Sequence, residues 1–403
     1  MLFQPFTFPN GTTAKNRFFK SAMEEQLADN NKPTQNLVNL YRTWAKGGAG
    51  VLVTGNVMIN KEGKGSVNDV VVSNEDDLAM LTAWADAGKT DGTLMIMQIN
   101  HAGKQSPKAV NPVPVAPSAV PLIGMDGFIN PPRELAGDEI LGLIDGFVKT
   151  AQIAQKAGFS GVQIHAAHGY LISQFLSPHH NTRTDEWGGC LDNRMRFLIK
   201  IYEGIRASVR PDFLVGVKLN SADFQKGGFD ENDSLAVVEK LSQMGIDFIE
   251  ISGGNYESPQ MLTAKQSTKE REAFFIDYAK KMKKISQVPL IITGGFRSKT
   301  AMNEALTSGD LDLVGIARPF ALVPDLPNQI QNGTYRTLAT NRIQTGASFI
   351  DKKAGAMLEM NWYMAQMRLI GEGKSPNPKL SAWKVLFKTL WENGKAGLST
   401  GRS

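Results

Sequence analysis

The chain has 403 residues, of which 42% are hydrophobic and 21% are charged, and this composition excludes a disordered or fibrous protein. The single cysteine, Cys190, excludes an internal disulfide, a cysteine-rich zinc site and an iron–sulfur cluster held by several thiolates. The net charge is +5, and residues 371–403 supply most of it with six basic and two acidic residues, so we expect no nucleic-acid-binding surface on the body of the chain.

The N-terminus does not resemble a secretory signal, because no basic stretch precedes an apolar core and Pro5 and Pro9 interrupt the sequence. The long uncharged run 109–125 contains four prolines and is too short to cross a membrane. We therefore expect a cytoplasmic protein without a membrane span.

Short apolar runs rich in β-branched residues alternate along the chain with longer segments of helical periodicity. This alternation is typical of βα units whose parallel sheet is buried on both faces. There are eight such runs, at residues 17–23, 50–55, 94–99, 161–165, 214–220, 247–252, 289–294 and 312–317. Eight units predict an α/β fold with one (β/α)8 TIM barrel over residues 1–330.

The helix boundaries are also visible in the sequence. Glycine stands directly before several of the predicted strands, where a helix is expected to end. Four polar residues precede periodic segments and are predicted N-caps: Thr34, Asp138, Asn232 and Ser298.

Two connections are much longer than usual, at residues 100–137 after the third strand and 166–192 after the fourth. Because the loops that follow barrel strands lie on the C-terminal face, where active sites are built, we expect the chemistry there.

Residues 331–403 are predicted to form a C-terminal helical extension. Within it, residues 380–391 place four apolar side chains on one helical stripe beside two lysines: Leu380, Trp383, Phe387 and Trp391, with Lys384 and Lys388. We favour a helix that packs on the barrel or on a second protomer of a homo-oligomer. Binding to a membrane surface is the alternative.

The segment IHAAHGYL leaves the fourth strand and brings His165, His168 and Tyr170 within six residues. Two imidazoles can donate to one carbonyl or nitro oxygen, and a nearby phenol can deliver a proton. Two other interpretations remain open. The histidines could bind only loop backbone, or they could hold zinc with a further ligand from residues 179–185.

The segments TGGFR and GIARPF close the seventh and eighth strands. Glycines allow backbone N–H groups to approach an anion, and Arg318 would add a charge-assisted hydrogen bond, so a phosphate site is expected here. The alternative is that both segments are only turns. Since the sequence has no GxGxxG segment after a strand, a nicotinamide nucleotide would have to bind the barrel mouth directly.

Residues 2–326 resemble the old yellow enzyme family of FMN-dependent NADH:flavin oxidoreductases and ene-reductases. The similarity rests on KNRFFKSAM (15–23), YRTWAKGGAGVLVTGNV (41–57), QINHAGKQ (98–105), HAAHGYLISQFLSPHHNTRTDEWGGCLDNR (165–194), ITGGFR and GIARPF. The long segment that begins at His165 is the most specific of them.

The resemblance implies non-covalent FMN, with NAD(P)H as reductant and no metal. It implies that His165 and His168 bind the substrate oxygen and that Tyr170 donates the proton. It also implies a set of residues around the cofactor: Ala22, Met23, Glu24, Gly55, Gln98, Lys218, Gly294, Gly295, Ala317 and Arg318.

Three of these positions depart from the commoner family pattern. Ala22 stands where proline is frequent, Lys218 where arginine is usual, and Glu24 where a threonine or cysteine normally faces the flavin. Lysine keeps the charge but loses the planar fork of arginine.

The expected reaction is hydride transfer from NAD(P)H, through flavin N5, to the β-carbon of an α,β-unsaturated carbonyl or nitro compound. Two alternatives remain at this point. They are a barrel isomerase or lyase acting on a phosphorylated substrate, and a flavin-binding protein without catalysis.

Overall fold

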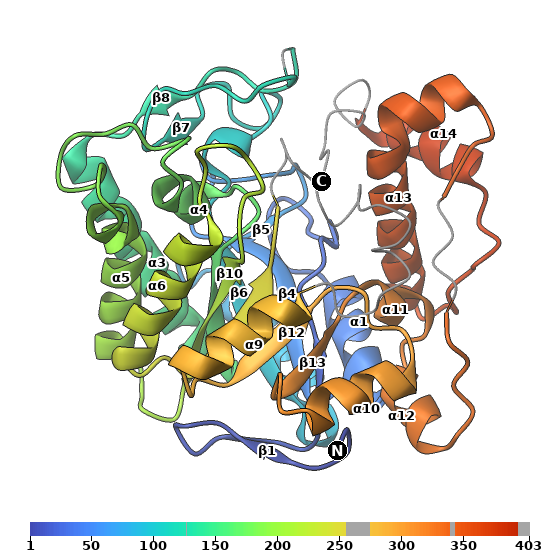
Figure 1. Cartoon of the computed structure of the whole chain (residues 1–403). Helices are drawn as coiled ribbons and strands as arrows, with labels where there is room; N and C mark the ends of the chain where they lie inside the picture. The colour runs from blue at the N-terminus through green and yellow to red at the C-terminus, as the bar shows by residue number, and fades with distance from the viewer. Residues whose placement is uncertain (126, 255–274, 339–342, 394–403) are drawn as a thin grey trace.

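The computed structural model describes residues 1–125, 127–254, 275–338 and 343–393 (Figure 1). Eight parallel strands form a barrel, closed where the first pairs with both the second and the eighth. They are β3 (Phe18–Lys20), β4 (Val51–Met58), β6 (Leu94–Asn100), β9 (Gly161–Ala166), β10 (Leu214–Asn220), β11 (Phe248–Ser252), β12 (Leu290–Thr293) and β13 (Leu313–Ile316). Each overlaps one predicted run, so the predicted TIM barrel is confirmed.

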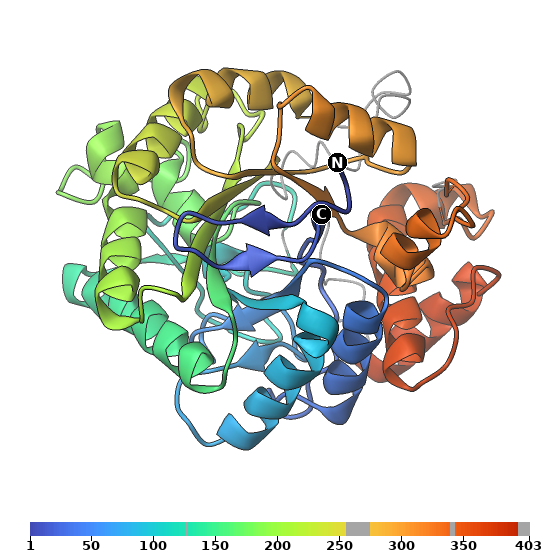
Figure 2. The ribbon, with the colours of Figure 1, turned by 90° about the horizontal axis from the view of Figure 1, so that it is seen from below.

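Apolar side chains from seven of the strands fill the lower part of the barrel. Phe19 and Phe248 meet there edge to face, with ring centroids 5.9 Å apart. A hairpin of β1 (Phe6–Thr7) and β2 (Thr13–Ala14) crosses the lower end, and Phe8 packs into the same cluster (Figure 2). The bottom of the barrel is therefore closed, which leaves the opposite, C-terminal end for a ligand.

A ring of helices covers the outside of the barrel (Figure 2). It includes α1 (Gln35–Lys46), α2 (Leu78–Gly88), α3 (Gly137–Lys156), α5 (Leu191–Ser208), α6 (Glu231–Gln243), α9 (Ile276–Ile285) and α10 (Lys299–Thr307). Glycines in the left-handed region end four of them as predicted, namely Gly48, Gly158, Gly245 and Gly309.

The predicted N-caps need two corrections. Ser298 accepts a hydrogen bond from the Ala301 N–H as expected, and Thr34 occupies the N-cap position of α1 without a side-chain cap. The caps of α3 and α6 lie two residues earlier than predicted, so Asp138 and Asn232 are inside these helices. In α6 the side chain of Asp230 accepts the backbone N–H of Asp233. Because this bond already satisfies a free N–H group of the first turn, the N-cap is Asp230 and not Asn232.

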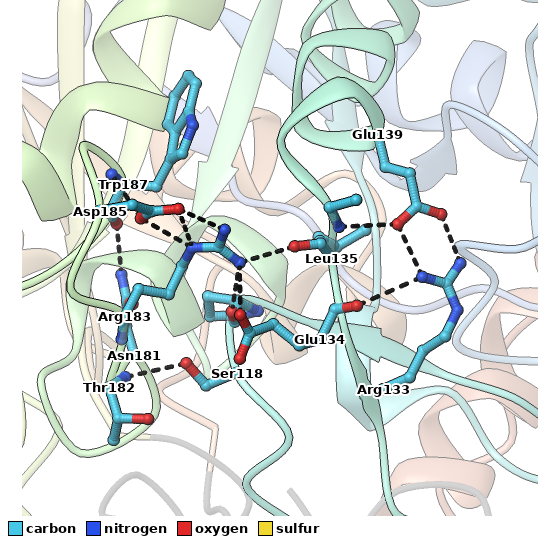
Figure 3. Close-up of polar contacts among 12 residues, drawn as sticks. Ser118, Arg133, Glu134, Leu135, Glu139, Asn181, Thr182, Arg183, Asp185 and Trp187 are labelled. Carbon is cyan, nitrogen blue, oxygen red and sulfur yellow. Dashed lines mark hydrogen bonds and ion pairs between the residues drawn. The ribbon is translucent and has the colours of Figure 1, made fainter.

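The two long loops after β6 and β9 are tied together by Arg183 (Figure 3). Its side chain is 7% exposed, and the guanidinium donates to Asp185, to Glu134 and to the carbonyl oxygens of Pro117 and Leu135. The short parallel pair β7 (Val115–Ala116) and β8 (Arg133–Glu134) forms within the first loop. One buried cation thus fixes both loops over the barrel mouth.

The C-terminal helices α13 (Ser348–Gly371) and α14 (Ala382–Asn393) stand beside the barrel (Figure 1). α13 contacts α1 and the short helix α11 (Arg318–Leu322), and α14 contacts α13. A second short helix, α12 (Leu326–Gln331), follows α11. Among the described residues, no helix combines the length and apolar character needed to cross a membrane.

Candidate active site

The turn that follows β9 brings three polar rings together at the C-terminal mouth. The ring of His165 lies 5.2 Å from that of His168 and 4.9 Å from that of Tyr170, measured between centroids. His165 is the fifth residue of β9, and Tyr170 is the N-cap of α4 (Leu171–Leu176). The structure therefore brings the three predicted site residues into contact with one another.

His168 is held in a strained conformation. Its φ of 61° lies in the left-handed region, which side chains other than glycine seldom adopt. The backbone N–H of His168 donates to Asn220 Oδ1 at 3.1 Å, and the ring Nε2 lies 2.7 Å from Ser252 Oγ. Neighbouring strand ends therefore turn this imidazole toward His165.

Both imidazoles are neutral at physiological pH. Burial, with the nearby Lys218 charge, lowers the pKa of His168 to about 3 and holds the pKa of His165 well below its ordinary value. His165 Nδ1 accepts the Ala167 N–H at 3.3 Å, so its proton is on Nε2. A neutral ring with a free N–H is a hydrogen-bond donor to a substrate oxygen, not a general base.

A chain of buried polar side chains runs across the barrel below the rings. Gln98 Nε2 donates to Gln163, Gln163 Nε2 donates to Glu250, and each of these bonds is 2.7 Å long. Lys218 Nζ lies 3.1 Å from Glu250, and both side chains are at most 5% exposed. The strand register explains the contacts, because Gln98 is paired with Gln163 and Lys218 with Glu250.

Glu250 is ionised despite its burial. Burial alone would raise the pKa of this carboxyl, but the Lys218 charge and hydrogen bonds from Thr293 and Gln163 together hold the pKa below its ordinary value. Thr293 Oγ1 donates to Glu250 at 2.7 Å and lies 2.6 Å from Ser21 Oγ. The network therefore links five strands and holds Lys218 at the centre of the mouth.

A bulge in β4 shapes the next part of the wall. The pairing with β6 shifts between Val53 and Asn56, and the Gly55 N–H turns to donate to Glu25 at 3.0 Å. A side chain at Gly55 would meet Glu25 Oε2 at 2.3 Å, so the backbone approach here requires glycine. Glu25 also accepts the Tyr41 hydroxyl.

Glu24 shares a hydrogen bond with Asp69 and accepts Asn56 Nδ2 at 3.0 Å. Asp69 already accepts two backbone N–H groups and the Ser66 hydroxyl, which favour its ionised form. Burial and the Asp69 charge raise the pKa of Glu24 well above its ordinary value. Burial raises the pKa of Asp69 as well, so the two carboxyls share one proton, and the hydrogen bonds that Asp69 accepts place this proton on Glu24.

This protonation state predicts how stability depends on pH. A carboxyl whose pKa is raised by folding stabilises the fold below its unfolded pKa, and the contribution is lost as pH rises through the folded pKa. We expect the unfolding free energy of the wild type to fall relative to Glu24→Gln as pH rises above about 4.5. Urea titrations of the apoprotein at several pH values measure this difference. The exposed Glu304→Gln is the control and should show a constant offset. A constant offset for Glu24→Gln as well would mean that Glu24 is ionised in the fold.

The predicted phosphate residues lie together after β12 and β13. Gly294 and Gly295 have φ values of 150° and 92°, which leave room for backbone to approach a ligand. Arg318 follows Ala317 and forms a 2.8 Å ion pair with Glu359 of α13. The guanidinium has five N–H donors, so this pair leaves others for a phosphate.

These residues fit a flavin mononucleotide. Gln98 Oε1 has no partner among the described residues and can accept an N–H from a pyrimidine ring. Lys218 can bind an adjacent carbonyl, and Ala22 and Met23 continue from β3 as partly buried apolar wall. The glycine pair and Arg318 are suited to a phosphate group.

The zinc interpretation has no support in the described part of the chain, where no group of three or more His, Cys, Asp or Glu residues could hold a metal. His180 lies 2.8 Å from Lys104 Nζ, which also donates to the Val120 carbonyl. His180 therefore belongs to the packing between the two long loops.

Sequence reasoning missed several site residues: Asn56, Asp69, Gln163, Asn220, Glu250, Ser252 and Thr293. A signal was present for some of them. In GVQIH and DFIEIS, Gln163 and Glu250 interrupt strands that are otherwise apolar, and a charge in such a strand needs a buried partner. The partner itself could not be identified without the register.

Comparisons with known proteins agree with this geometry. The NADH:flavin oxidoreductase / NADH oxidase family model matches residues 1–337. The NADH-dependent flavin oxidoreductase iliE of Hypocrea jecorina is 38% identical over 81% of this chain and 88% of its own length. The NADH-dependent flavin oxidoreductase nadA of Aspergillus parasiticus is 37% identical over 80% of this chain and 76% of its own length.

Solved structures show the same fold. An old yellow enzyme homologue from Zymomonas mobilis is 28% identical, with a TM-score of 0.71, covering 83% of this chain and 94% of its own. A 2-naphthoyl-CoA reductase complexed with 2-naphthoyl-CoA is 30% identical, with a TM-score of 0.76, covering 82% of this chain and 52% of its own. The family assignment favours an oxidoreductase over the isomerase and the non-catalytic alternatives. The chain therefore belongs to the NADH:flavin oxidoreductase / NADH oxidase family and is an FMN-dependent enzyme of the old yellow enzyme type.

Proposed function

We propose that this enzyme reduces the activated carbon–carbon double bond of an α,β-unsaturated carbonyl or nitro compound, with NAD(P)H as the reductant. The observation that supports it best is the placement of two neutral imidazoles and one phenol around a single point at the barrel mouth. Bound FMN supplies the hydride-transfer chemistry that no side chain offers.

His165 and His168 donate N–H groups to the substrate oxygen and polarise the conjugated system. His165 uses Nε2–H, while His168 uses Nδ1–H when its Nε2 accepts the Ser252 hydroxyl. Because burial, together with the Lys218 charge, lowers the pKa of both rings, they remain neutral at working pH. Tyr170, whose ring lies beside that of His165, delivers a proton to the α-carbon of the same substrate.

The remaining residues position the cofactor. We assign the pyrimidine edge to Gln98 and Lys218 and the apolar wall to Ala22, Met23 and Gly55. The phosphate is assigned to Gly294, Gly295, Ala317 and Arg318. Glu24 stands where the commoner family pattern has a threonine or cysteine, and with its proton donated to Asp69 it presents only acceptor oxygens there.

The direct test uses the purified protein. Heat or acid should release FMN, NAD(P)H should bleach its visible absorption, and an enone such as cyclohexenone should restore it. Release of FAD would contradict the cofactor assignment. The proposed substrate class would be contradicted if oxygen, but none of a panel of enones and nitroalkenes, restored the visible absorption of the reduced protein.

Removing either imidazole should weaken substrate binding and turnover together. We expect His165→Ala and His168→Ala each to slow enone reduction by ~10²–10³, the usual cost of one oxyanion donor. The affinity for a phenol, which presents an oxygen to the same donors, should fall in parallel and can be followed by absorbance titration. The loop histidine variant His179→Ala is the control. Unchanged phenol affinity in both mouth variants would show that the oxygen binds elsewhere.

A further inference from the structure

The outward face of α14 carries an aromatic stripe made of Trp383, Phe387 and Trp391. The three residues follow a spacing of four, and their exposed fractions are 38%, 63% and 91%. Trp383 and Phe387 stack, with centroids 5.9 Å apart and an interplanar angle of 27°. The three side chains therefore form an exposed ridge along α14, within which Trp383 and Phe387 are in ring contact.

Apart from Trp383, whose Nε1 donates to the Thr345 carbonyl at 2.9 Å, the described residues leave this ridge exposed. α14 packs through its opposite face, where Ala382, Val385, Leu386 and Thr389 are each at most 8% exposed. The sequence favours a helix that packs on the barrel or on a second protomer; in the structure α14 packs on α13 and its aromatic stripe faces outward. The largest exposed apolar patch of a protein is often a binding surface, which makes this ridge a candidate docking site.

The charges beside the ridge show what kind of partner fits. Lys384 and Lys388 are exposed and each follows an aromatic residue directly, so a cationic column runs along the ridge. Residues 371–403 supply +4 of the net charge of +5. A partner that matches both features has an apolar layer for the aromatic rings and a negatively charged surface for the lysines. An anionic lipid leaflet, with its acyl chains below its headgroups, has this arrangement.

We propose that α14 docks the enzyme on anionic membranes, lying in the interface with Trp383, Phe387 and Trp391 inserted and the two lysines on the headgroups. The helix has 12 residues, against about 20 needed to span a bilayer, so it lies in the plane of the surface.

A second copy of the chain is the weaker alternative. Aromatic side chains offer about 150–250 Å² each, so the exposed parts of the three rings present roughly 400 Å². A stable protein interface needs about 800 Å² from each partner. Pairing two ridges would also bring two lysine columns close together.

The test measures co-sedimentation of the full-length holoenzyme with vesicles. We expect binding to vesicles of phosphatidylcholine with phosphatidylglycerol, little binding to phosphatidylcholine alone, and loss of binding at high salt. The double variant Phe387→Ser/Trp391→Ser should lose binding. Lys384→Glu/Lys388→Glu should lower the partition coefficient by roughly tenfold or more, given the usual contribution of each lysine.

Two controls match these changes. Lys280→Glu/Lys284→Glu reverses two exposed lysines with the same spacing on α9, and Phe349→Ser removes an aromatic ring that is 75% exposed and lies outside α14. Both should bind as the wild type does. Retained binding by Phe387→Ser/Trp391→Ser would overturn the proposal. The proposal would also be overturned if the wild-type protein did not bind vesicles and sedimented as a dimer while Phe387→Ser/Trp391→Ser sedimented as a monomer.

Discussion

Tyr170→Phe should slow reduction of an enone by ~10²–10⁴, the range associated with loss of a general acid, while reduction of the flavin by NAD(P)H keeps nearly its full rate. The asymmetry follows from geometry. The Tyr170 ring lies 4.9 Å from His165, and its hydroxyl is 3.5 Å from Asn56 Nδ2, which places it beside the proposed substrate site. Reduction by NAD(P)H needs no proton on carbon and therefore does not need this group.

Stopped-flow absorbance separates the two half-reactions. Tyr202→Phe is the matched control, because Tyr202 is also buried and donates one hydrogen bond, to the Met244 carbonyl in the outer helical layer. Both rates should be unchanged in it. If Tyr170→Phe lowered both rates equally, Tyr170 would support cofactor binding and not proton delivery. If it lowered neither, the proton would come from solvent or another group.

The barrel could be predicted because each of its strands is marked locally. A run such as LVGVKLN is apolar, β-branched and bounded by turn residues, and β10 occupies the same seven positions. Glycine C-caps such as Gly158 are equally local, since one residue supplies the left-handed conformation. The misplaced cap of α6 shows the limit. Asp230 and Asn232 are both acceptable caps, and the start of the apolar stripe decided between them.

The site residues also divide into those that a local pattern predicts and those that depend on distant contacts. His165, His168 and Tyr170 lie within six residues, so a short segment was enough to bring them together. The partners that fix their chemistry come from other strands. The ion pair of Arg318 with Glu359 joins residues 41 positions apart, and the bond between Glu24 and Asp69 joins two loops. No local pattern indicates such pairings, because they depend on the register of the barrel and on helix packing.

The buried pair of Lys218 and Glu250 should be the most costly contact to break. Glu250→Ala leaves an ammonium group buried without its counter-charge, and loss of one partner of a buried pair typically costs about 3–5 kcal/mol. We expect an unfolding free energy lower by that amount at neutral pH. The exposed Glu239→Ala on α6 should change it by less than about 0.5 kcal/mol.

The pH dependence identifies the cause of that loss. Because the pKa of Glu250 is lowered by folding, its contribution is present above the unfolded value near 4.5 and is lost as pH falls through the folded pKa. Wild type and Glu250→Ala should therefore differ most near neutral pH and converge as the solution is acidified. Denaturant titrations across this range measure the gap, and Glu250→Gln, which keeps the hydrogen bond from Gln163, should fall between the two. A gap that stays constant down to the acid limit would mean that the lost packing volume, and not the charge opposite Lys218, stabilises this layer of the barrel.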